Sequence, residues 1–148
     1  MLRPADSHDV RFLRDMLRHA YHWRLAEDAE RPVYRYVRGW GRKGDAGVVA
    51  VEGPHAYGAA WYRLFTADEP GFGFVDEATP ELTIAVVPSR RGKGAGKRLL
   101  EALLERARGE GYAAVSLSTD PGQVGWYEQF GFEKVGDTSH AVTMRARL

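Results

Sequence analysis

The sequence predicts an α/β (α+β) fold, in which a mixed and mainly antiparallel sheet of about six to seven strands is flanked by helices. Three observations support this fold class. Short β-branched and aromatic segments alternate along the chain with helix-like segments. The 148 residues match the usual size of one domain, and 44% of them are hydrophobic, which is enough for a core. We therefore expect residues 1–148 to form a single domain.

The N-terminal half predicts a strand, a helix and a further, less regular segment. Leu2–Pro4 can form only a short strand, after which Asp6 or Ser7 can cap a helix. The apolar face of that helix comprises Val10, Leu13, Met16, Leu17 and Ala20. Residues 21–47 mix aromatic with charged side chains, and they predict a second helix that is broken or started near Pro32 and followed by a Gly-rich turn.

The central part of the chain predicts three strands. Residues 47–52 and 57–65 are rich in β-forming residues and are separated by the turn GPH, which predicts an antiparallel hairpin. A long polar loop follows over residues 66–81. Residues 82–88 then predict a buried strand that ends at Pro88.

The C-terminal part predicts two helices among three strands. The first helix buries a stripe of Leu99, Leu100, Leu103, Leu104 and Ala107. A strand over 113–119 follows, then a short helix from Pro121 to Phe130 that stops at Gly131. The last two strands are expected around 132–136 and 141–148.

Composition and charge restrict the function. Lys and Arg number 21 against 20 Asp and Glu, so a net charge of +1 provides no overall field that would favour nucleic acid or an anionic membrane. We find no apolar run long enough to span a membrane and no secretory leader, and we expect a cytoplasmic protein. The absence of cysteine excludes disulfides, thiolate metal sites and a Cys nucleophile, and we expect no metal.

A basic, glycine-rich segment joins the strand at 82–88 to the helix that follows. It reads RRGKGAG over residues 90–96, and its glycines allow backbone N–H groups to point inward beside the free N–H groups of the helix's first turn. Such a turn can bind an anion, and Arg91, Lys93 and Lys97 would add charge at its rim. The spacing fits neither G-x-x-x-x-G-K-[ST] nor G-x-G-x-x-G, which leaves R-x-x-G-x-G. The alternative is an ordinary solvated basic turn or a nuclear-localisation-like cluster.

Two segments together resemble a known family. Residues 91–96, preceded by LTIAVVPSR and followed by KRLLEALLERARGEGY, resemble the acetyl-coenzyme A signature of the Gcn5-related N-acetyltransferase (GNAT) family. The segment DPGQVGWYEQFGF, residues 120–132, resembles the family's later motif, in which an Asn-led helix carries a Leu-Tyr pair and ends in Gly-Phe. In this segment Asp120, Gln123 and Trp126 stand where Asn, a small residue and Leu are usual.

The resemblance implies the acyl-CoA N-acyltransferase fold, in which a parallel pair of strands splays apart and acetyl-CoA enters between them as an extra pseudo-strand. Backbone groups of residues 84–86 would then bond the pantetheine amides. The residues implied to bind the cofactor are Ile84, Ala85, Val86, Arg91, Gly92, Lys93, Gly94, Ala95, Gly96, Lys97, Asp120 and Tyr127.

The implied chemistry is acyl transfer from a thioester to an amine, which needs a neutral amine, a donor for the oxyanion and a proton for the leaving thiolate. Without cysteine to form an acyl-enzyme, direct attack in a ternary complex is the natural route. The match to the family implies that Tyr127 protonates the thiolate, although such a tyrosine is otherwise a packing residue. In relatives a carboxylate on the strand before the motif takes the amine proton, which points to Glu81, provided that the strand register turns it toward the site.

The sequence gives less information about the residues that bind the acceptor amine and accept its proton. His22, His55 and His140 are rival bases because the ordinary pKa of histidine suits proton transfer near neutral pH, but no spacing directs them to the site. The acceptor pocket is expected between the first two helices and the last two strands, as in relatives. Residues 21–24 (YHWR) and 34–40 (YRYVRGW) could line it, although a helix with one core face and one solvated face explains the same pattern.

These observations lead to the hypothesis of an N-acetyltransferase that moves acetyl from acetyl-CoA to the primary amine of a small molecule or peptide, with a second copy of the chain as a candidate partner. Two alternatives remain. One is a non-catalytic acyl-CoA sensor. The other is an RNA-directed module that uses RRGKGAGKR as a phosphate clamp, such as a charged-tRNA acetyltransferase, and the near-neutral charge argues against a pure RNA binder.

Overall fold

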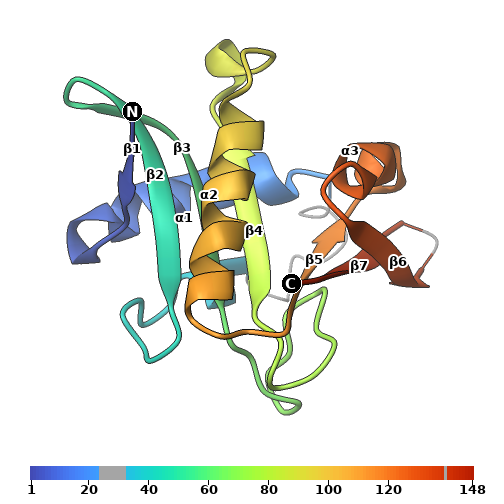
Figure 1. The fold of residues 1–148 in the computed structure, drawn as a ribbon. Helices are drawn as coiled ribbons and strands as arrows, with labels where there is room; N and C mark the ends of the chain where they lie inside the picture. Colours follow the sequence, from blue (N-terminus) through green and yellow to red (C-terminus); the bar gives the residue numbers. More distant parts are fainter. Residues whose placement is uncertain (24–32, 139) are drawn as a thin grey trace.

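A mixed sheet organises the fold (Figure 1). The computed structural model describes residues 1–23, 33–138 and 140–148. The sheet formed by these residues has seven strands in the order β1-β2-β3-β4-β5-β7-β6. The strands are β1 (Leu2–Pro4), β2 (Ala46–Glu52), β3 (His55–Arg63), β4 (Glu81–Val86), β5 (Ala114–Thr119), β6 (Phe132–Asp137) and β7 (Val142–Arg147). Only β4 and β5 pair in parallel, which confirms the predicted mixed, mainly antiparallel sheet.

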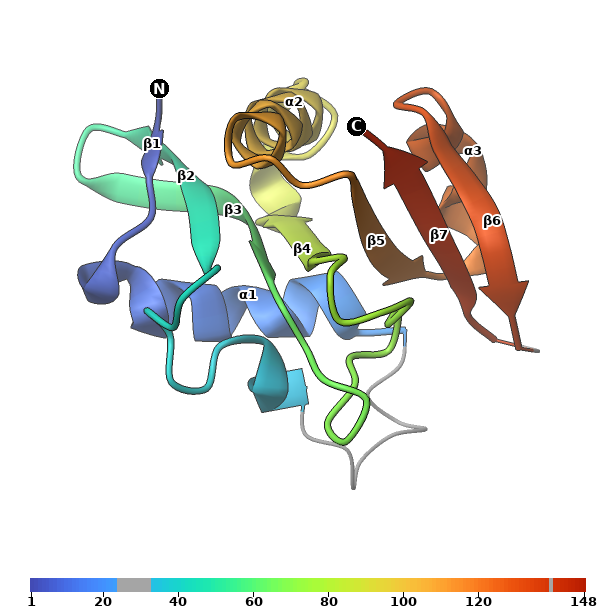
Figure 2. The same cartoon turned by 60° about the horizontal axis from the view of Figure 1, so that its bottom comes forward.

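Two long helices cover opposite faces of this sheet, as Figure 2 shows. They are α1 (Val10–Tyr21) and α2 (Ala95–Gly109), and a short helix, α3 (Val124–Glu128), packs beside β6. The 3-10 helices are η1 (Ser7–Asp9), η2 (Val33–Tyr36), η3 (Pro88–Arg90) and η4 (Pro121–Gln123). Within the described parts of the chain, no helix combines the length and the apolar character needed to cross a membrane.

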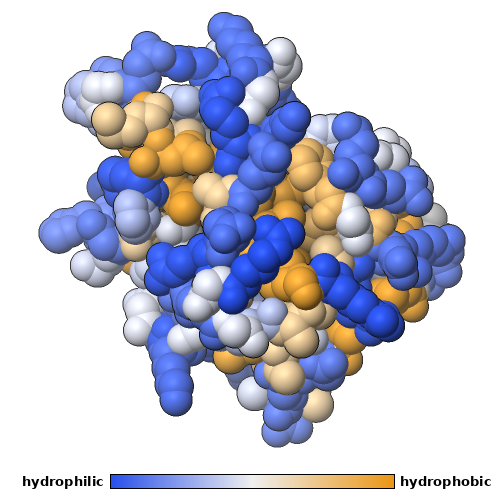
Figure 3. Space-filling view, viewed as in Figure 1, coloured by the Kyte–Doolittle hydropathy of each residue, from blue (hydrophilic) through white to orange (hydrophobic). Residues whose placement is uncertain are grey.

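The leucine stripe of α2 forms the core on one face of the sheet. All five predicted residues of the stripe, Leu99, Leu100, Leu103, Leu104 and Ala107, are buried. The opposite face of α2 is polar, and Figure 3 shows its charged side chains as a blue band in front of the sheet. This division follows from the 3.6-residue period of the apolar positions and holds α2 flat against the sheet.

Hydrogen bonds at its N-terminal end fix where α1 begins. Asp6 caps η1, and the Asp9 carboxylate accepts a 2.8 Å hydrogen bond from the Asp6 N–H. Arg3 on β1 donates to both oxygens of Asp9, at 2.8 and 2.7 Å. From the predicted face of α1, the buried residues are Leu13, Met16 and Leu17, while Val10 and Ala20 are half-buried.

The hairpin is confirmed with shifted bounds, because β3 begins at His55 and ends at Arg63. The second helix expected near Pro32 falls partly on residues 24–32, which lie outside the described residues. After them, only the 3-10 helix η2 forms, and the α-helical expectation for that part is wrong. Three glycines with positive φ, at 39, 41 and 44, turn the backbone there and are incompatible with a continuing helix.

A buried arginine holds this irregular segment in place. The guanidinium of Arg63, on β3, donates to both carboxylate oxygens of Asp45 at 3.0 and 2.7 Å. It also donates to the backbone carbonyls of Arg35 and Arg38 at 3.0 and 2.7 Å. The side chains of Arg63 and Asp45 are 0% and 1% exposed. One side chain of the sheet therefore binds two backbone carbonyls and one carboxylate of residues 35–45 and ties this segment to β3.

Replacing Arg63 with Met should destabilise the protein strongly, because it leaves the buried carboxylate of Asp45 without its partner. Breaking such a pair costs about 3–5 kcal/mol, measurable by urea denaturation. Arg38→Met is the matched control, since the Arg38–Glu69 pair is 60% and 71% exposed and should contribute about 0–1 kcal/mol. Equal losses in the two variants would contradict the structural role of Arg63.

Candidate functional site

The parallel strands β4 and β5 separate almost as soon as they meet. Residues 81–86 and 114–119 are all described, and the two strands share one paired position, Glu81 with Ser116. Beyond it, β4 continues along β3, and β5 continues along β7. The edge of β4 that faces β5 is therefore left without a strand partner over its C-terminal part.

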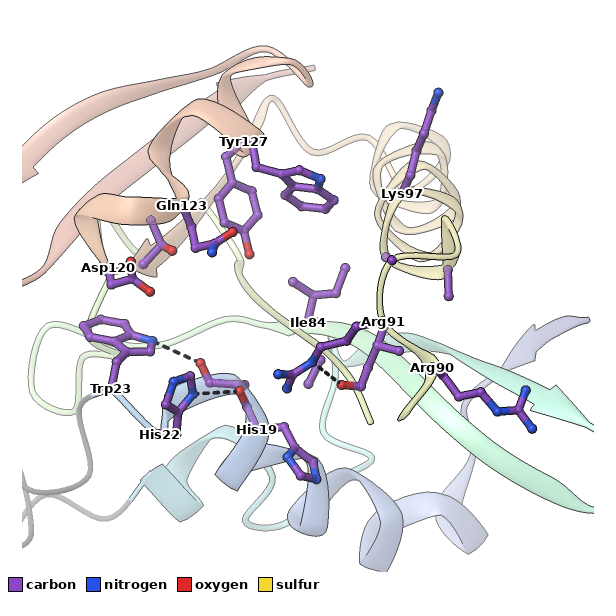
Figure 4. A pocket seen from close by; sticks show the side chains of 18 of the residues that line it. His19, His22, Trp23, Ile84, Arg90, Arg91, Lys97, Asp120, Gln123 and Tyr127 are labelled. Atoms are coloured by element: carbon purple, nitrogen blue, oxygen red, sulfur yellow. Dashed lines mark hydrogen bonds between the residues drawn. The ribbon is translucent and has the colours of Figure 1, made fainter. Parts of the chain in front are cut away.

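A cavity of about 420 Å³ lies at this open edge (Figure 4). Its walls come from four parts of the chain. The C-terminal end of α1 and the two residues that follow it contribute His19, Ala20, His22 and Trp23, and β4 contributes Ile84, Ala85 and Val86. The glycine-rich turn and the start of α2 contribute Arg90, Arg91, Gly92, Gly94, Ala95, Gly96 and Lys97. The end of β5 and the helices after it contribute Thr119, Asp120, Gln123, Trp126 and Tyr127.

The backbone of β4 presents polar groups to this cavity. The N–H of Val87 donates to the carbonyl of Tyr57 at 2.9 Å and thus points toward β3. Because these directions alternate along a strand, the groups of Ala85 also face β3, whereas those of Ile84 and Val86 face the open edge. Of the three predicted backbone contacts, two face the cavity.

The glycine-rich turn folds as the sequence predicts. Gly92 and Gly94 have φ of 79° and 82°, a conformation that residues with a Cβ rarely adopt, and Gly94 caps α2. The first N–H groups of α2 follow directly and provide positive potential beside the cavity. Lys97 lines the cavity, but Lys93 is not among its lining residues.

The two arginines of the turn point in opposite directions. Arg90 pairs with Glu52 at 2.9 Å and lies over the ring of Tyr57, with 4.8 Å from guanidinium carbon to ring centre. The Arg91 Nε donates to the Val86 carbonyl at 3.0 Å. Figure 4 shows the guanidinium of Arg91 directed toward α1 and not outward to the predicted phosphate rim.

The segment from Asp120 to Tyr127 forms the opposite wall. Asp120 Oδ1 accepts the Gly122 N–H at 2.8 Å and so caps η4. In Figure 4 the Tyr127 hydroxyl points into the cavity toward β4. Burial, and secondarily the charge of Asp120, raise the pKa of Tyr127, so the phenol stays protonated at physiological pH. The ring of Trp126 packs against Tyr127 and Phe130 and lies close to Gly96.

On the α1 wall, sequence reasoning includes His22 and Trp23 in the predicted acceptor segment 21–24, and His22 as a rival base, but it misses His19. His19, His22 and Trp23 are spaced at i, i+3 and i+4, which places them on one face beside the apolar stripe of α1. That spacing is the signal that could have identified the wall. Burial lowers the pKa of His19, and the positive charges of Arg91, Arg18 and His22 lower it further.

Glu81 lies away from the cavity. Its side chain is 1% exposed, is not among the lining residues, and accepts a short hydrogen bond from the Tyr36 hydroxyl. Next to it, the Tyr21 and Thr83 hydroxyls are 2.8 Å apart. Burial, followed by the charge of Glu81, raises the pKa of both tyrosines. A role for Glu81 as base therefore stays a prediction and would require an intermediary such as water.

The other residues predicted for the acceptor side lie partly at the cavity and partly away from it. His55 and His140 do not line the cavity. From the predicted acceptor segments, His22 and Trp23 reach the cavity, Tyr36 contacts Glu81, and Arg24 lies outside the described residues. Among residues 1–23, 33–138 and 140–148, no group of three or more His, Cys, Asp or Glu side chains is arranged to bind a metal ion.

Comparisons with known proteins identify both the fold and a family. The model of the acetyltransferase (GNAT) family matches residues 10–132. Ribosomal-protein-alanine N-acetyltransferase from Brucella melitensis is similar with a TM-score of 0.72 and 22% identity, over 100% of this chain and 99% of that chain. Phosphinothricin acetyltransferase from Sinorhizobium meliloti, in complex with AcCoA, has a TM-score of 0.69 and 22% identity, over 100% and 88% of the two chains.

A third structure, aminoglycoside 6'-N-acetyltransferase complexed with coenzyme A, has a TM-score of 0.70 and 18% identity, over 99% of this chain and 96% of that chain. Among curated proteins, no sequence matches significantly. The structural likenesses confirm the acyl-CoA N-acyltransferase fold that the sequence motifs implied.

The ionisation of His19 offers a test of how Arg91 is placed. In an NMR titration, the imidazole of His19 should protonate at a lower pH than an ordinary histidine, whose pKa is about 6.5. Arg91→Met removes a nearby positive charge and should raise the pKa of His19, although burial will keep it below the ordinary value. Arg90→Met should leave the pKa of His19 unchanged, because Arg90 points toward Glu52. The same titration curve in both variants would mean that Arg91 lies elsewhere.

Proposed function

This chain belongs to the acetyltransferase (GNAT) family, and we propose that it transfers the acetyl group of acetyl-CoA to a primary amine by direct attack in a ternary complex. The observation that carries this proposal is the open edge of β4, which lies in one cavity with the glycine-rich turn and the Tyr127 hydroxyl. Acetyl-CoA supplies the acetyl group as a thioester.

The residues present suit such a cosubstrate. The outward N–H and carbonyl of Ile84 and the outward N–H of Val86 can pair with an amide-bearing chain such as pantetheine, while the Val86 carbonyl accepts from Arg91. At the end of β4, the left-handed turn and the first N–H groups of α2 suit a pyrophosphate, with Lys97 as a nearby cation. Gly94 has no side chain that would prevent close approach of the phosphates to the backbone.

Tyr127 is the proton donor that we assign to the leaving sulfur. Its hydroxyl points into the cavity, and its raised pKa ensures that it carries a proton. Because a thiol is a stronger acid than this phenol, transfer of the proton is uphill, and it becomes possible only as negative charge builds up on the sulfur while the carbon–sulfur bond breaks. The absence of cysteine from the chain supports direct attack by the amine over an acyl-enzyme.

Release of free thiol from acetyl-CoA tests the proposed activity when it is measured against a library of amines. Acetyl transfer that depends on the amine, with an acetylated product identified by mass spectrometry, is the expected result. A protein that binds acetyl-CoA by calorimetry but acetylates no amine would instead be an acyl-CoA sensor.

Gly94→Ala should weaken coenzyme A binding in a calorimetric titration. The new Cβ lies where the phosphates would approach the backbone, and the residue must also hold φ near 82°. Gly111→Ala is the control, because Gly111 has φ of 85° and no neighbour within 4 Å, and it lies beyond the far end of α2. Both variants should lose about 1–3 kcal/mol of stability through backbone strain. Equal affinity of both variants for coenzyme A would remove the turn from the binding site.

Tyr127→Phe should lower kcat while leaving the affinity for acetyl-CoA intact, because one oxygen is lost and the ring packing is kept. Positioned acid catalysis is worth about 10²–10⁴-fold, and we expect the lower end because a thiolate leaves more easily than an alkoxide. Steady-state and single-turnover rates with a productive amine measure the effect. An unchanged rate under conditions where chemistry limits turnover would leave Tyr127 with a packing role alone.

A further inference from the structure

Charges of opposite sign face each other across the acceptor side of the cavity. The guanidinium of Arg91 points from the glycine-rich turn toward α1, where the neutral imidazole of His19 lies, and Asp120 lies at the wall that leads into α3. Among the described residues that line the cavity, Asp120 is the only carboxylate, since Glu81 is buried elsewhere. A ligand that matches this arrangement carries a positive or proton-rich group at one end and an anion at the other.

A hydrogen bond holds Arg91 so that its positive charge lies toward α1. The hydrogen bond from its Nε to the Val86 carbonyl anchors the guanidinium at the end of β4. In Figure 4 the guanidinium extends from this anchor toward α1, and its charge lowers the pKa of His19 there. The two terminal nitrogens of a guanidinium held in this way can bind a carboxylate through two parallel hydrogen bonds. The phosphates retain the backbone N–H groups of the glycine-rich turn and Lys97, which line the same cavity.

Asp120 lies on the same wall of the cavity as Tyr127. One of its oxygens, Oδ1, caps η4 through Gly122, so the carboxylate is fixed in direction. It lies near enough to Tyr127 for its charge to raise the pKa of that hydroxyl. An amine must approach the same thioester whose sulfur receives the proton of Tyr127, and it therefore comes within reach of Asp120.

We propose that the acceptor is a small amino acid-like zwitterion, whose amine lies toward Asp120 and whose carboxylate is bound by Arg91 with His19 beside it. This inference rests on the proposed acetyl transfer. The cavity of about 420 Å³ must also hold the part of the donor that lies along β4, which favours a small acceptor.

These groups account for each bond and each proton in the transfer. The amine nitrogen forms a bond to the acetyl carbon as the carbon–sulfur bond breaks, and the sulfur takes the proton of Tyr127. The nitrogen loses a proton to Asp120, and exchange with solvent then restores both side chains. Asp120 stabilises the positive charge that develops on nitrogen during attack, which a neutral side chain would not do.

The test compares α-amino acids with their methyl esters as acceptors, because the ester removes the negative charge and little else. Rates are compared per fraction of neutral amine, since the two amines have different pKa values. The acid of a productive pair should have a kcat/KM at least about tenfold above that of its ester, in line with a hydrogen bond to a charged group. Calorimetric titration into the complex with coenzyme A should give the same order of affinities without turnover.

Arg91→Met should abolish the preference for the acid over the ester while leaving the affinity for coenzyme A unchanged. Arg90→Met is the matched control and should keep the acid-to-ester ratio, because the Arg90 guanidinium is engaged with Glu52 and Tyr57. If Arg91→Met loses coenzyme A affinity but keeps the acid-to-ester ratio of kcat/KM, Arg91 binds the phosphates of the cofactor. That result would overturn the inference.

Asp120→Asn keeps an oxygen that can cap η4 but removes the charge. It should lower kcat/KM for acids and esters alike, by roughly tenfold to a hundredfold, and leave their ratio intact. Glu81→Gln should lower kcat/KM less than Asp120→Asn does, for acids and esters alike. Esters or simple monoamines that react as well as the acids would overturn this inference and leave the proposed function standing. If no amine reacts at all, the result contradicts both this inference and the proposed acetyl transfer.

Discussion

The separation of β4 from β5 is the constraint on which the rest of the structure depends. The two strands meet at Glu81 and Ser116, and each then follows a different neighbour, β3 on one side and β7 on the other. Both of these antiparallel pairings extend over the whole strand, so each half of the sheet is stable without contact across the opening. The cavity is therefore built into the topology.

Different elements contribute the functional groups around the opening. The turn before α2 provides backbone N–H groups and the cation Lys97, while the segment before α3 provides Asp120 and Tyr127. The C-terminal end of α1 closes the third side with His19, His22 and Trp23. Because these residues are carried by three separate elements anchored on one sheet, the distances between them are set by packing on the sheet.

Much of the fold was predictable from the sequence, and the parts that were not have physical reasons. The leucine stripe of α2 and the strand at β4 follow from simple periodicity, and the turn between them follows from its glycines. The role of Arg63 could not be read in the same way, because a lone arginine in a strand usually indicates a solvated face. Only the fold shows that this one reaches the carbonyls of Arg35 and Arg38.

The same limit applies to the site. Sequence motifs identified the turn, Asp120 and Tyr127, but spacing alone does not determine the direction of a side chain. Glu81 lies on the strand that the motif indicated, yet the register turns it toward Tyr36 and away from the cavity. Arg91 likewise stands at the expected position with its guanidinium turned toward α1.

The open edge of β4 also has a consequence for solubility. Unpaired strand edges are sites where chains aggregate. This edge lies inside the sheet, between flanking elements, and its Val86 carbonyl is bonded to Arg91. The flanking elements limit access to this edge, and a slender, flexible molecule can still pair with its remaining backbone groups.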